Sequence, residues 1–163
     1  MHVNEKLIRD FYAAFAKRDA SGMAACYHPE IAFSDPAFPM LRGKEATAMW
    51  AMLCSRGKDL EIILGDVSAD DAGGRAHWEA KYTFSQTSRF VHNKIDAVFA
   101  FRDGKIVRHI DTFGFWAWSR QSLGGLGLML GWFGPLKSMV RKKAAKSLHD
   151  YMEKHEGAFP VPG

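Results

Sequence analysis

The sequence predicts an α+β domain built on an antiparallel sheet, and three observations lead to this fold class. Apolar residues recur at helical spacing in the first third of the chain. From residue 60 to residue 116, long segments alternate apolar and polar residues and are separated by turn residues, as in an antiparallel meander. A further helical pattern closes the chain as an extension. Because the helices precede the strands instead of alternating with them, we expect α+β layers and no parallel βαβ units.

The first helix is expected to begin near Asn4, a candidate N-cap, and to end where Asp19 and Ser21 break the pattern. The residues of its apolar stripe are Leu7, Ile8, Phe11, Tyr12 and Phe15. A second, short helix is expected over residues 23–27, and the His-Pro pair that follows is expected to end it.

A short strand is expected next, followed by a proline-containing loop and a third helix. These segments are residues 31–34, 36–42 and 43–54. Four long strands are then expected over residues 60–69, 75–85, 90–101 and 105–116. The last two are joined by Asp103-Gly104, a dipeptide typical of the tightest hairpin turns.

The C-terminal third is expected to cover the domain. The run from Leu123 to Leu136 is apolar and rich in glycine, and it is shorter than the roughly 20 residues of a membrane helix. It fits a lid or a connection, and a helix from Pro135 to about Lys154 is expected to fold back as a cap, so membrane contact is not expected. The expected organisation is one α+β domain over residues 1–120, a lid or capping helical extension over residues 121–156 and a loose tail over residues 157–163.

Composition narrows the possible functions. With 163 residues, 47% hydrophobic and 13% aromatic, the chain is long enough for one domain with a sizeable core. Much of the net charge of +4 comes from one late segment that contains Lys137, Arg141, Lys142, Lys143 and Lys146. No zinc-ligand spacing, arginine-rich arm or phosphate-binding loop accompanies it, so neither nucleic-acid binding nor a metal site is expected.

The two cysteines indicate the compartment. Cys26 and Cys54 lie in unrelated segments, and neither belongs to a CxxC motif. Free, buried thiols fit a reducing environment, and the charged start of the chain lacks the features of a secretory signal. We therefore expect a cytoplasmic protein.

His109 and Asp111 are the first candidate functional residues. They stand two apart on one expected strand, so their side chains share a face, and Phe113 and Phe115 continue that row. A carboxylate that orients an imidazole among aromatic rings indicates a pocket with acid–base chemistry. The alternative is a pair that satisfies its own hydrogen bonds in the core or faces a dimer partner.

Asp35 is the third candidate. An Asp-Pro pair commonly starts a turn, in which the carboxylate caps its own loop. Close to Phe33 and Phe38, however, the carboxylate would resist ionisation, and its pKa would move towards neutral pH, as a proton-transfer group needs. Both interpretations remain open from the residues alone.

Several motifs in a fixed order then point to a family. They are Phe11-Tyr12 in the first helix, Tyr27 before the first strand, Asp35-Pro36, Arg42-Gly43-Lys44 before a helix, and Asp103-Gly104-Lys105-Ile106 in the last hairpin. From about Glu5 to Gly124 the chain resembles the SnoaL-like polyketide cyclase and ketosteroid isomerase-like branch of the nuclear transport factor two (NTF2-like) superfamily. The resemblance implies a cone-shaped curved antiparallel sheet wrapped around the N-terminal helices, with an apolar cavity that takes a small hydrophobic molecule. It also implies a homodimer formed through the outer face of the sheet.

The resemblance assigns roles to single residues. Asp35 matches the base that shuttles a proton in ketosteroid isomerases. The helix-one tyrosine of those enzymes falls on Phe11 by ungapped counting, with Tyr12 one position away. Their second oxyanion-hole acid falls on Asp96, or on Ala97 if the hairpin loop is one residue shorter, and alternation leaves both open.

The cyclase motif matches in part. The segment Gln121-Ser122-Leu123-Gly124 resembles that of SnoaL-type cyclases, but Gly114 stands where those enzymes carry their acid–base Asp. We therefore do not expect the cyclase reaction unchanged.

The cavity wall is expected to hold the ligand. Besides the candidate catalytic residues Asp35, His109 and Asp111, the candidate ligand-binding residues are Tyr12, Trp50, Trp78, Tyr82, Asp96, Phe99 and Phe113. The large rings among them are also expected as core residues, since in this fold the core lines the cavity. Asp96 has a second interpretation, as a salt-bridge partner of Lys94 or Lys81 or a residue of the dimer seam.

Two functions follow from these residues. The first is an enzyme without metal or organic cofactor that performs acid–base chemistry on a small apolar, cyclic or carbonyl-bearing molecule, as an isomerase, cyclase, dehydratase or epoxide hydrolase. The second is a non-catalytic module for hydrophobic-ligand binding or dimerisation, which Phe11 and Gly114 favour because they replace residues known for chemistry.

Overall fold

The computed structural model describes residues 1–125 and 134–163. Two helices open the chain and lead into the sheet: α1 (Val3–Ala16), α2 (Ala20–Cys26), β1 (Tyr27–Ser34), the short β2 (Leu41–Arg42) and α3 (Lys44–Arg56). Four long strands follow, and helices close the chain: β3 (Glu61–Ala69), β4 (Gly74–Phe84), β5 (Arg89–Arg102), β6 (Lys105–Thr112), α4 (Phe115–Leu123) and α6 (Gly134–Lys154).

The strands form one six-stranded sheet in the order β2-β1-β6-β5-β4-β3. Strands β3 to β6 are the predicted antiparallel meander. One pair departs from the predicted antiparallel pattern, because β1 runs parallel to β6, with Phe33 opposite His109. No hairpin links these two strands, which are separated in the chain by α3 and four further strands, so turn geometry does not impose an antiparallel direction.

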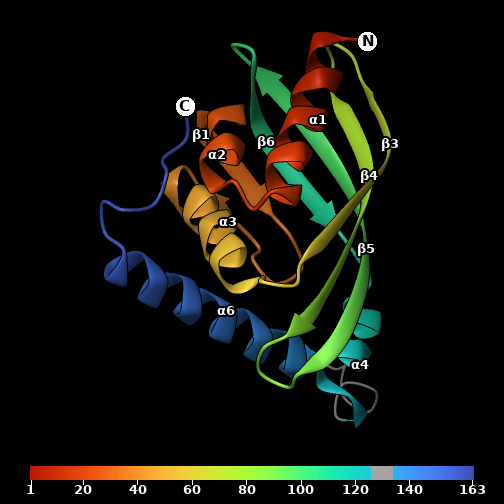
Figure 1. Ribbon diagram of the computed structural model, residues 1–163, viewed down its shortest axis with the longest axis vertical. Coiled ribbons are helices and arrows are strands. Elements are labelled where there is room, and N and C mark those ends of the chain that lie inside the picture. Colours follow the sequence, from red (N-terminus) through yellow and green to blue (C-terminus); the bar gives the residue numbers. More distant parts are fainter. Residues whose placement is uncertain (126–133) are drawn as a thin grey trace.

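The sheet curls around the early helices, as the cone-shaped α+β prediction requires (Figure 1). Helices α1, α2 and α3 lie within its concave side, α4 lies at one end of β5 and β6, and α6 packs on α3 as a separate outer helix. The C-terminal helical extension is therefore present. The boundary expected after residue 120 falls inside α4.

The apolar stripe predicted for α1 is buried, and this is what fixes the helix to the sheet. Ile8, Phe11 and Tyr12 are all within 1% of full burial. The helix is capped by His2, whose Nδ1 accepts from the backbone N–H of Asn4, while the Asn4 side chain donates to the Asp70 carbonyl oxygen at 2.9 Å. Asn4 therefore ties α1 to the β3–β4 turn instead of capping the helix.

Two strand boundaries differ from the expectation. The His-Pro pair lies inside β1, which begins at Tyr27, directly after α2. On the neighbouring strand, β6 stops at Thr112, and α4 begins at Phe115 after an extended Gly114. Phe113 and Phe115 therefore leave the row of His109 and Asp111. The predicted hairpin turn is confirmed, because Asp103 and Gly104 both adopt positive φ, of 53° and 72°, as the tightest turn type requires.

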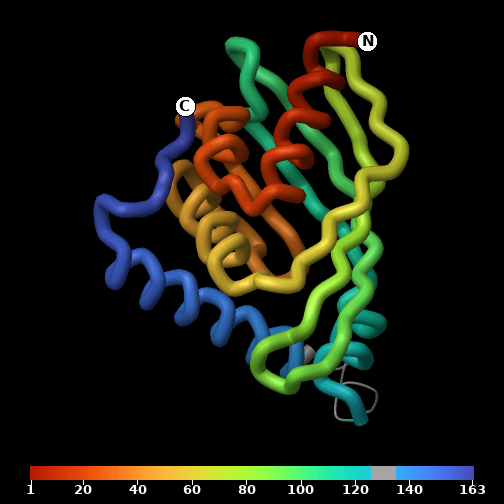
Figure 2. The backbone as a smooth tube through the Cα atoms, in the orientation of Figure 1, coloured from red at the N-terminus to blue at the C-terminus, as the bar shows by residue number. Residues whose placement is uncertain are grey.

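The C-terminal segment that follows α6 contacts the domain at two points. Phe159 packs against the core, and the backbone N–H of Gly163 donates to the Ala24 carbonyl oxygen at 3.4 Å, so the chain returns from α6 alongside α2 (Figure 2). The expected lid falls largely on residues 126–133, outside the described residues. No helix of the described part has both the length and the apolar character needed to cross a membrane.

Candidate functional site

A buried hydrogen-bond chain crosses the interior and contains two of the three candidate catalytic residues. Trp50 Nε1 donates to the Tyr27 hydroxyl at 2.8 Å, and that hydroxyl lies 2.8 Å from His109 Nδ1. His109 Nε2 lies 2.9 Å from Asp111 Oδ1, which also accepts from Trp78 Nε1 at 3.3 Å. Four elements, α3, β1, β6 and β4, thus supply one continuous polar chain inside an apolar core.

One arrangement of protons satisfies the whole chain. The Trp50 indole can only donate, so Tyr27 accepts from it and can pass its own O–H to His109 Nδ1. With the imidazole proton on Nε2, that group donates to Asp111, where Trp78 donates as well. Every donor then has an acceptor, and two N–H groups converge on Asp111 Oδ1.

Aromatic rings surround the parts of the His109 imidazole that take no part in the hydrogen-bond chain. The imidazole is fully buried and stacks on Trp50 with 5.9 Å between ring centroids. The rings of Phe99, Phe33 and Phe11 lie at 4.5, 5.0 and 5.5 Å. Trp50, Trp78 and Phe99 are therefore core residues that enclose the His109–Asp111 pair.

Tyr12 brings an unpaired hydroxyl to this region. The residue is 1% exposed, and within the described part of the chain its hydroxyl is the one buried side-chain polar atom that lacks a hydrogen-bond partner. Burial raises the pKa of Tyr12 well above its ordinary value, and the nearby Asp111 charge raises it further. Tyr12 therefore stays protonated, and its hydroxyl can donate a hydrogen bond. Phe11, the position that matches the helix-one tyrosine of ketosteroid isomerases by ungapped counting, has no hydroxyl, and its ring stacks on Tyr27.

Asp35 lies at the carboxyl end of β1, in a turn that it stabilises itself. Its Oδ1 accepts from the backbone N–H groups of Ala37 and Phe38 at 2.7 and 2.6 Å, and its own N–H donates to the Phe38 carbonyl oxygen at 2.9 Å. The turn interpretation is therefore confirmed.

The electrostatic setting of Asp35 agrees with the second interpretation as well. Burial of the carboxyl raises its pKa to about 7, against the lowering effect of the Phe38 amide. The charge of Asp111 raises this pKa further, and the cation of Arg141 lowers it. A carboxyl group with a pKa near neutral pH can both accept and return a proton.

Tyr82 connects the sheet to α4. The Tyr82 hydroxyl accepts from Trp118 Nε1 at 2.8 Å, which joins β4 to α4. Burial raises the pKa of Tyr82, and the charge of Asp35 contributes to this rise. Phe113, between β6 and α4, is partly buried against the core.

Asp96 lies outside the site. Its side chain is 81% exposed on the outer face of β5 and accepts from the His77 side chain at 2.9 Å, not from Lys94 or Lys81. Ala97 points inward instead, 1% exposed and opposite Asp111 in the β5–β6 pair. The ligand-binding role predicted for Asp96 is thus wrong, because the strand register turns its side chain to the convex face. The inward position on β5 is thus Ala97, whose side chain is a methyl group.

Three residues of this region were not singled out from the sequence as site residues. Tyr27 was noted only as a motif residue, and Trp118 and Arg141 had no signal of their own. Each contributes through a contact between elements far apart in the chain, which periodicity within one element does not reveal.

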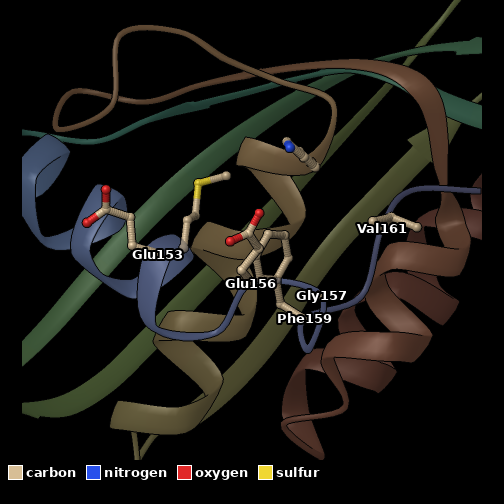
Figure 3. A pocket seen from close by; sticks show the side chains of 7 residues that line it. Glu153, Glu156, Gly157, Phe159 and Val161 are labelled. Carbon is tan, nitrogen blue, oxygen red and sulfur yellow. The ribbon is translucent and has the colours of Figure 1, made fainter.

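Two pockets lie against α6, on the outside of the ring-packed interior. The larger, of about 720 Å³, lies between the end of α6, the C-terminal segment and the start of α3, with Glu153, Glu156 and Phe159 in its wall (Figure 3). The smaller, of about 380 Å³, lies between the loop that follows Asp35 and α6. The hollow expected within the cone is neither of these, and it stays a prediction. In the described part of the chain, no group of three His, Cys, Asp or Glu residues could hold a metal ion.

Comparison with known proteins identifies the family. The family model of the SnoaL-like domain matches residues 8–109, more than half of the chain, so the protein belongs to the SnoaL-like domain family. No curated protein sequence matches it.

Solved structures share the fold. An LEH-like epoxide hydrolase from M. tuberculosis has a TM-score of 0.62 and 18% identity, over 77% of this chain and 92% of that chain. TsrD from Streptomyces laurentii has a TM-score of 0.61 and 23% identity, over 73% and 93%. A protein of ketosteroid isomerase-like fold from Catenulispora acidiphila, in complex with trimethylamine, has a TM-score of 0.63 and 10% identity, over 72% and 92%. At these identities the likeness establishes the NTF2-like fold.

The two buried tyrosines should respond in opposite ways to removal of the hydroxyl. Tyr27→Phe leaves Trp50 Nε1 and His109 Nδ1 without a partner, so we expect a loss of about 1–3 kcal/mol in the free energy of unfolding. Tyr12→Phe removes an unpaired hydroxyl, and we expect no loss or a gain of about 1 kcal/mol. Urea unfolding measures both. Equal destabilisation by the two substitutions would contradict this assignment of hydrogen bonds.

The raised pKa of Asp35 should make stability depend on pH. The carboxyl has a pKa of about 7 in the folded protein against an ordinary value of 3.8, so the folded state holds the proton more tightly and stability falls as pH rises from 4 to 7. Asp35→Asn keeps an oxygen for the two amides and removes the charge. We expect this variant to match wild type at pH 4 and to exceed it by a few kcal/mol at pH 8, at about 1.4 kcal/mol per pKa unit.

Thermal unfolding across this pH range measures the effect, and Asp150→Asn is the control of opposite sign. Lys146 lowers the pKa of Asp150, so that carboxylate stabilises the fold above pH 4, and its replacement should destabilise at pH 8. If the difference between Asp35→Asn and wild type is the same at pH 4 and pH 8, Asp35 does not titrate as described.

Proposed function

We propose that this protein is an enzyme that performs acid–base chemistry, without a metal or organic cofactor, on a small apolar molecule that carries a carbonyl or epoxide oxygen. The observation that carries the proposal is the half-buried Asp35, whose Oδ1 is held by two backbone amides and whose carboxyl has its pKa raised to about 7. The charge of Asp111 acts on this carboxyl and also on the unpaired hydroxyl of Tyr12. An isomerase, cyclase, dehydratase or epoxide hydrolase would all use such groups.

The role proposed for Asp35 is transfer of the proton. As a carboxylate it takes a proton from a carbon next to a carbonyl, or from a water that attacks an epoxide, and as an acid it returns that proton to the product. The Ala37 and Phe38 amides hold Oδ1, so Oδ2 is the oxygen with freedom to react. Because the pKa lies near neutral pH, both protonation states are populated during the cycle.

The role proposed for Tyr12 is donation to the substrate oxygen. Its hydroxyl is buried without a protein partner and its pKa is raised, which keeps the proton in place. An unpaired buried donor costs stability, and a substrate oxygen that accepted from it would recover that cost in the bound state. Asp111, held by His109 and Trp78, then sets the local charge. The epoxide hydrolase among the structures of similar fold supports chemistry of this class.

The test uses two general probes. The first is exchange of the hydrogens next to the carbonyl of a cyclic ketone for deuterium, followed by proton NMR, and the second is hydrolysis of a cyclic epoxide. Asp35→Asn should lower the rate of the active probe at least 100-fold, the scale of general acid–base catalysis, because Asn cannot take up the proton. Binding, followed by tryptophan fluorescence, should change little in that variant.

Asp150→Asn, an exposed carboxylate on α6, is the matched control and should retain full activity. Unchanged turnover in Asp35→Asn would remove Asp35 from the reaction. Binding of both probes without any product would favour the non-catalytic module instead, an alternative that Phe11 in place of the family's tyrosine supports.

We further propose that the chain forms a homodimer through the outer face of the sheet. Phe90 and Val98 lie exposed on the convex side of β5, at 63% and 55%, on the same face as the polar cluster of His77, Glu79 and Asp96. Val98→Arg introduces a charge into this face, and we expect it to shift sedimentation from dimer to monomer while the fold is kept. Wild type that sediments as a monomer would contradict the proposal.

A further inference from the structure

The loop that carries Asp35 is attached to the C-terminal helix by a single polar contact. Arg141 Nε on α6 donates to the Pro36 carbonyl oxygen at 3.0 Å, across 105 residues of sequence. In the described part of the chain, this is the hydrogen bond that joins a side chain of α6 to the body of the protein. The two ion pairs of α6, Lys146 with Asp150 and His149 with Glu153, lie within the helix. Near its start, the Lys137 ammonium lies over the Phe115 ring of α4 at 5.8 Å from the centroid.

Apolar residues of the loop and of α6 surround this contact. Phe38, Leu41 and Leu148 are 8%, 7% and 4% exposed, so apolar burial holds the loop and the helix together. They also line a groove of about 380 Å³, which Arg141 lines as well. The Arg141–Pro36 hydrogen bond adds a directional contact, which apolar burial does not supply.

The Arg141–Pro36 hydrogen bond is linked to the Asp35 carboxylate through the backbone of the turn. Pro36 follows Asp35 directly, and the next two residues, Ala37 and Phe38, donate their backbone N–H groups to the Asp35 carboxylate. Displacement of the Pro36 carbonyl would thus move the peptide units that hold Oδ1.

We propose that Arg141 is a positioning residue for Asp35, which it holds through the Pro36 carbonyl, so that docking of α6 and the geometry of the Asp35 turn are coupled. This inference rests on the function proposed for Asp35. It gives the C-terminal helix a part in the site, although α6 contributes no group to the reacting atoms.

The charge of Arg141 adds a second effect on the same carboxyl. The groups whose charges or hydrogen bonds act on Asp35 are Asp111 on β6, Arg141 on α6 and the two amides of its own turn, and Tyr82 on β4 faces it as well. Arg141 is the cation among them, and it favours the carboxylate against burial and against Asp111. Loss of this cation should therefore raise the pH at which Asp35 loses its proton.

The experiment is a pH titration of the full-length protein labelled with carbon-13 at the aspartate carboxyls, in which the Asp35 signal is assigned by its absence in Asp35→Asn. Wild type should titrate near pH 7, and Arg141→Gln at a higher pH, by less than the shift that burial produces, because the Arg141 charge is the weakest of the influences on this carboxyl. Arg141→Lys keeps the charge and should titrate close to wild type. Lys142→Gln removes an exposed charge from the next position of α6 and is the matched control.

The geometric coupling has its own readout. Loss of the Arg141–Pro36 bond should speed hydrogen exchange at the Ala37 and Phe38 amides about tenfold in Arg141→Gln, and exchange in Lys142→Gln should stay at the wild-type rate. If Arg141→Gln does not fold, Arg141→Met, which keeps most of the apolar stem, takes its place.

An Asp35 midpoint and Ala37 and Phe38 exchange rates that stay at wild-type values in Arg141→Gln would overturn the inference. Full turnover of Asp35→Asn would overturn the proposed function and leave the titration result standing. The two failures are therefore distinguishable, since the titration and the exchange need no substrate.

Discussion

The structure depends on how one carboxylate is kept inside an apolar core. Asp111 is 4% exposed, and a buried carboxylate is tolerated only where hydrogen bonds compensate for its lost hydration. His109 and Trp78 both donate to its Oδ1, and Tyr27 with Trp50 extends the chain from His109. Because these residues come from four elements, the curvature of the sheet and the seating of α3 are tied to one polar chain.

The Asp111 charge also raises the pKa values of groups around it. It raises the pKa of Asp35 and adds to the rise in the pKa of Tyr12, so the two groups proposed to handle the proton and the substrate oxygen both respond to it. Both groups carry a cost at this position: the Asp35 carboxyl is desolvated, and the Tyr12 hydroxyl has no protein partner. Such costs are common at functional sites, where a bound substrate completes the contacts.

The NTF2-like fold accounts for the location of these groups and leaves the reaction to the residues themselves. A curled sheet offers one concave face, and the inward positions of β4, β5 and β6 converge on the helices within it. The family places many chemistries on this scaffold, so the positions that differ are informative. Here the inward position on β5 opposite Asp111 is Ala97 and not an acid, and the hydroxyl on α1 comes from Tyr12 and not from residue 11.

The sequence by itself determined the α+β class, the meander from β3 to β6, the hairpin at Asp103-Gly104 and the shared face of His109 and Asp111, because each follows from local periodicity or turn chemistry. Only the tertiary structure decided the parallel β1–β6 pair, the inward choice of Ala97 over Asp96 and the contacts of Tyr27, Trp118 and Arg141. Strand register and contacts between distant elements result from packing across the whole chain, so they cannot be predicted from residues that are neighbours in the sequence.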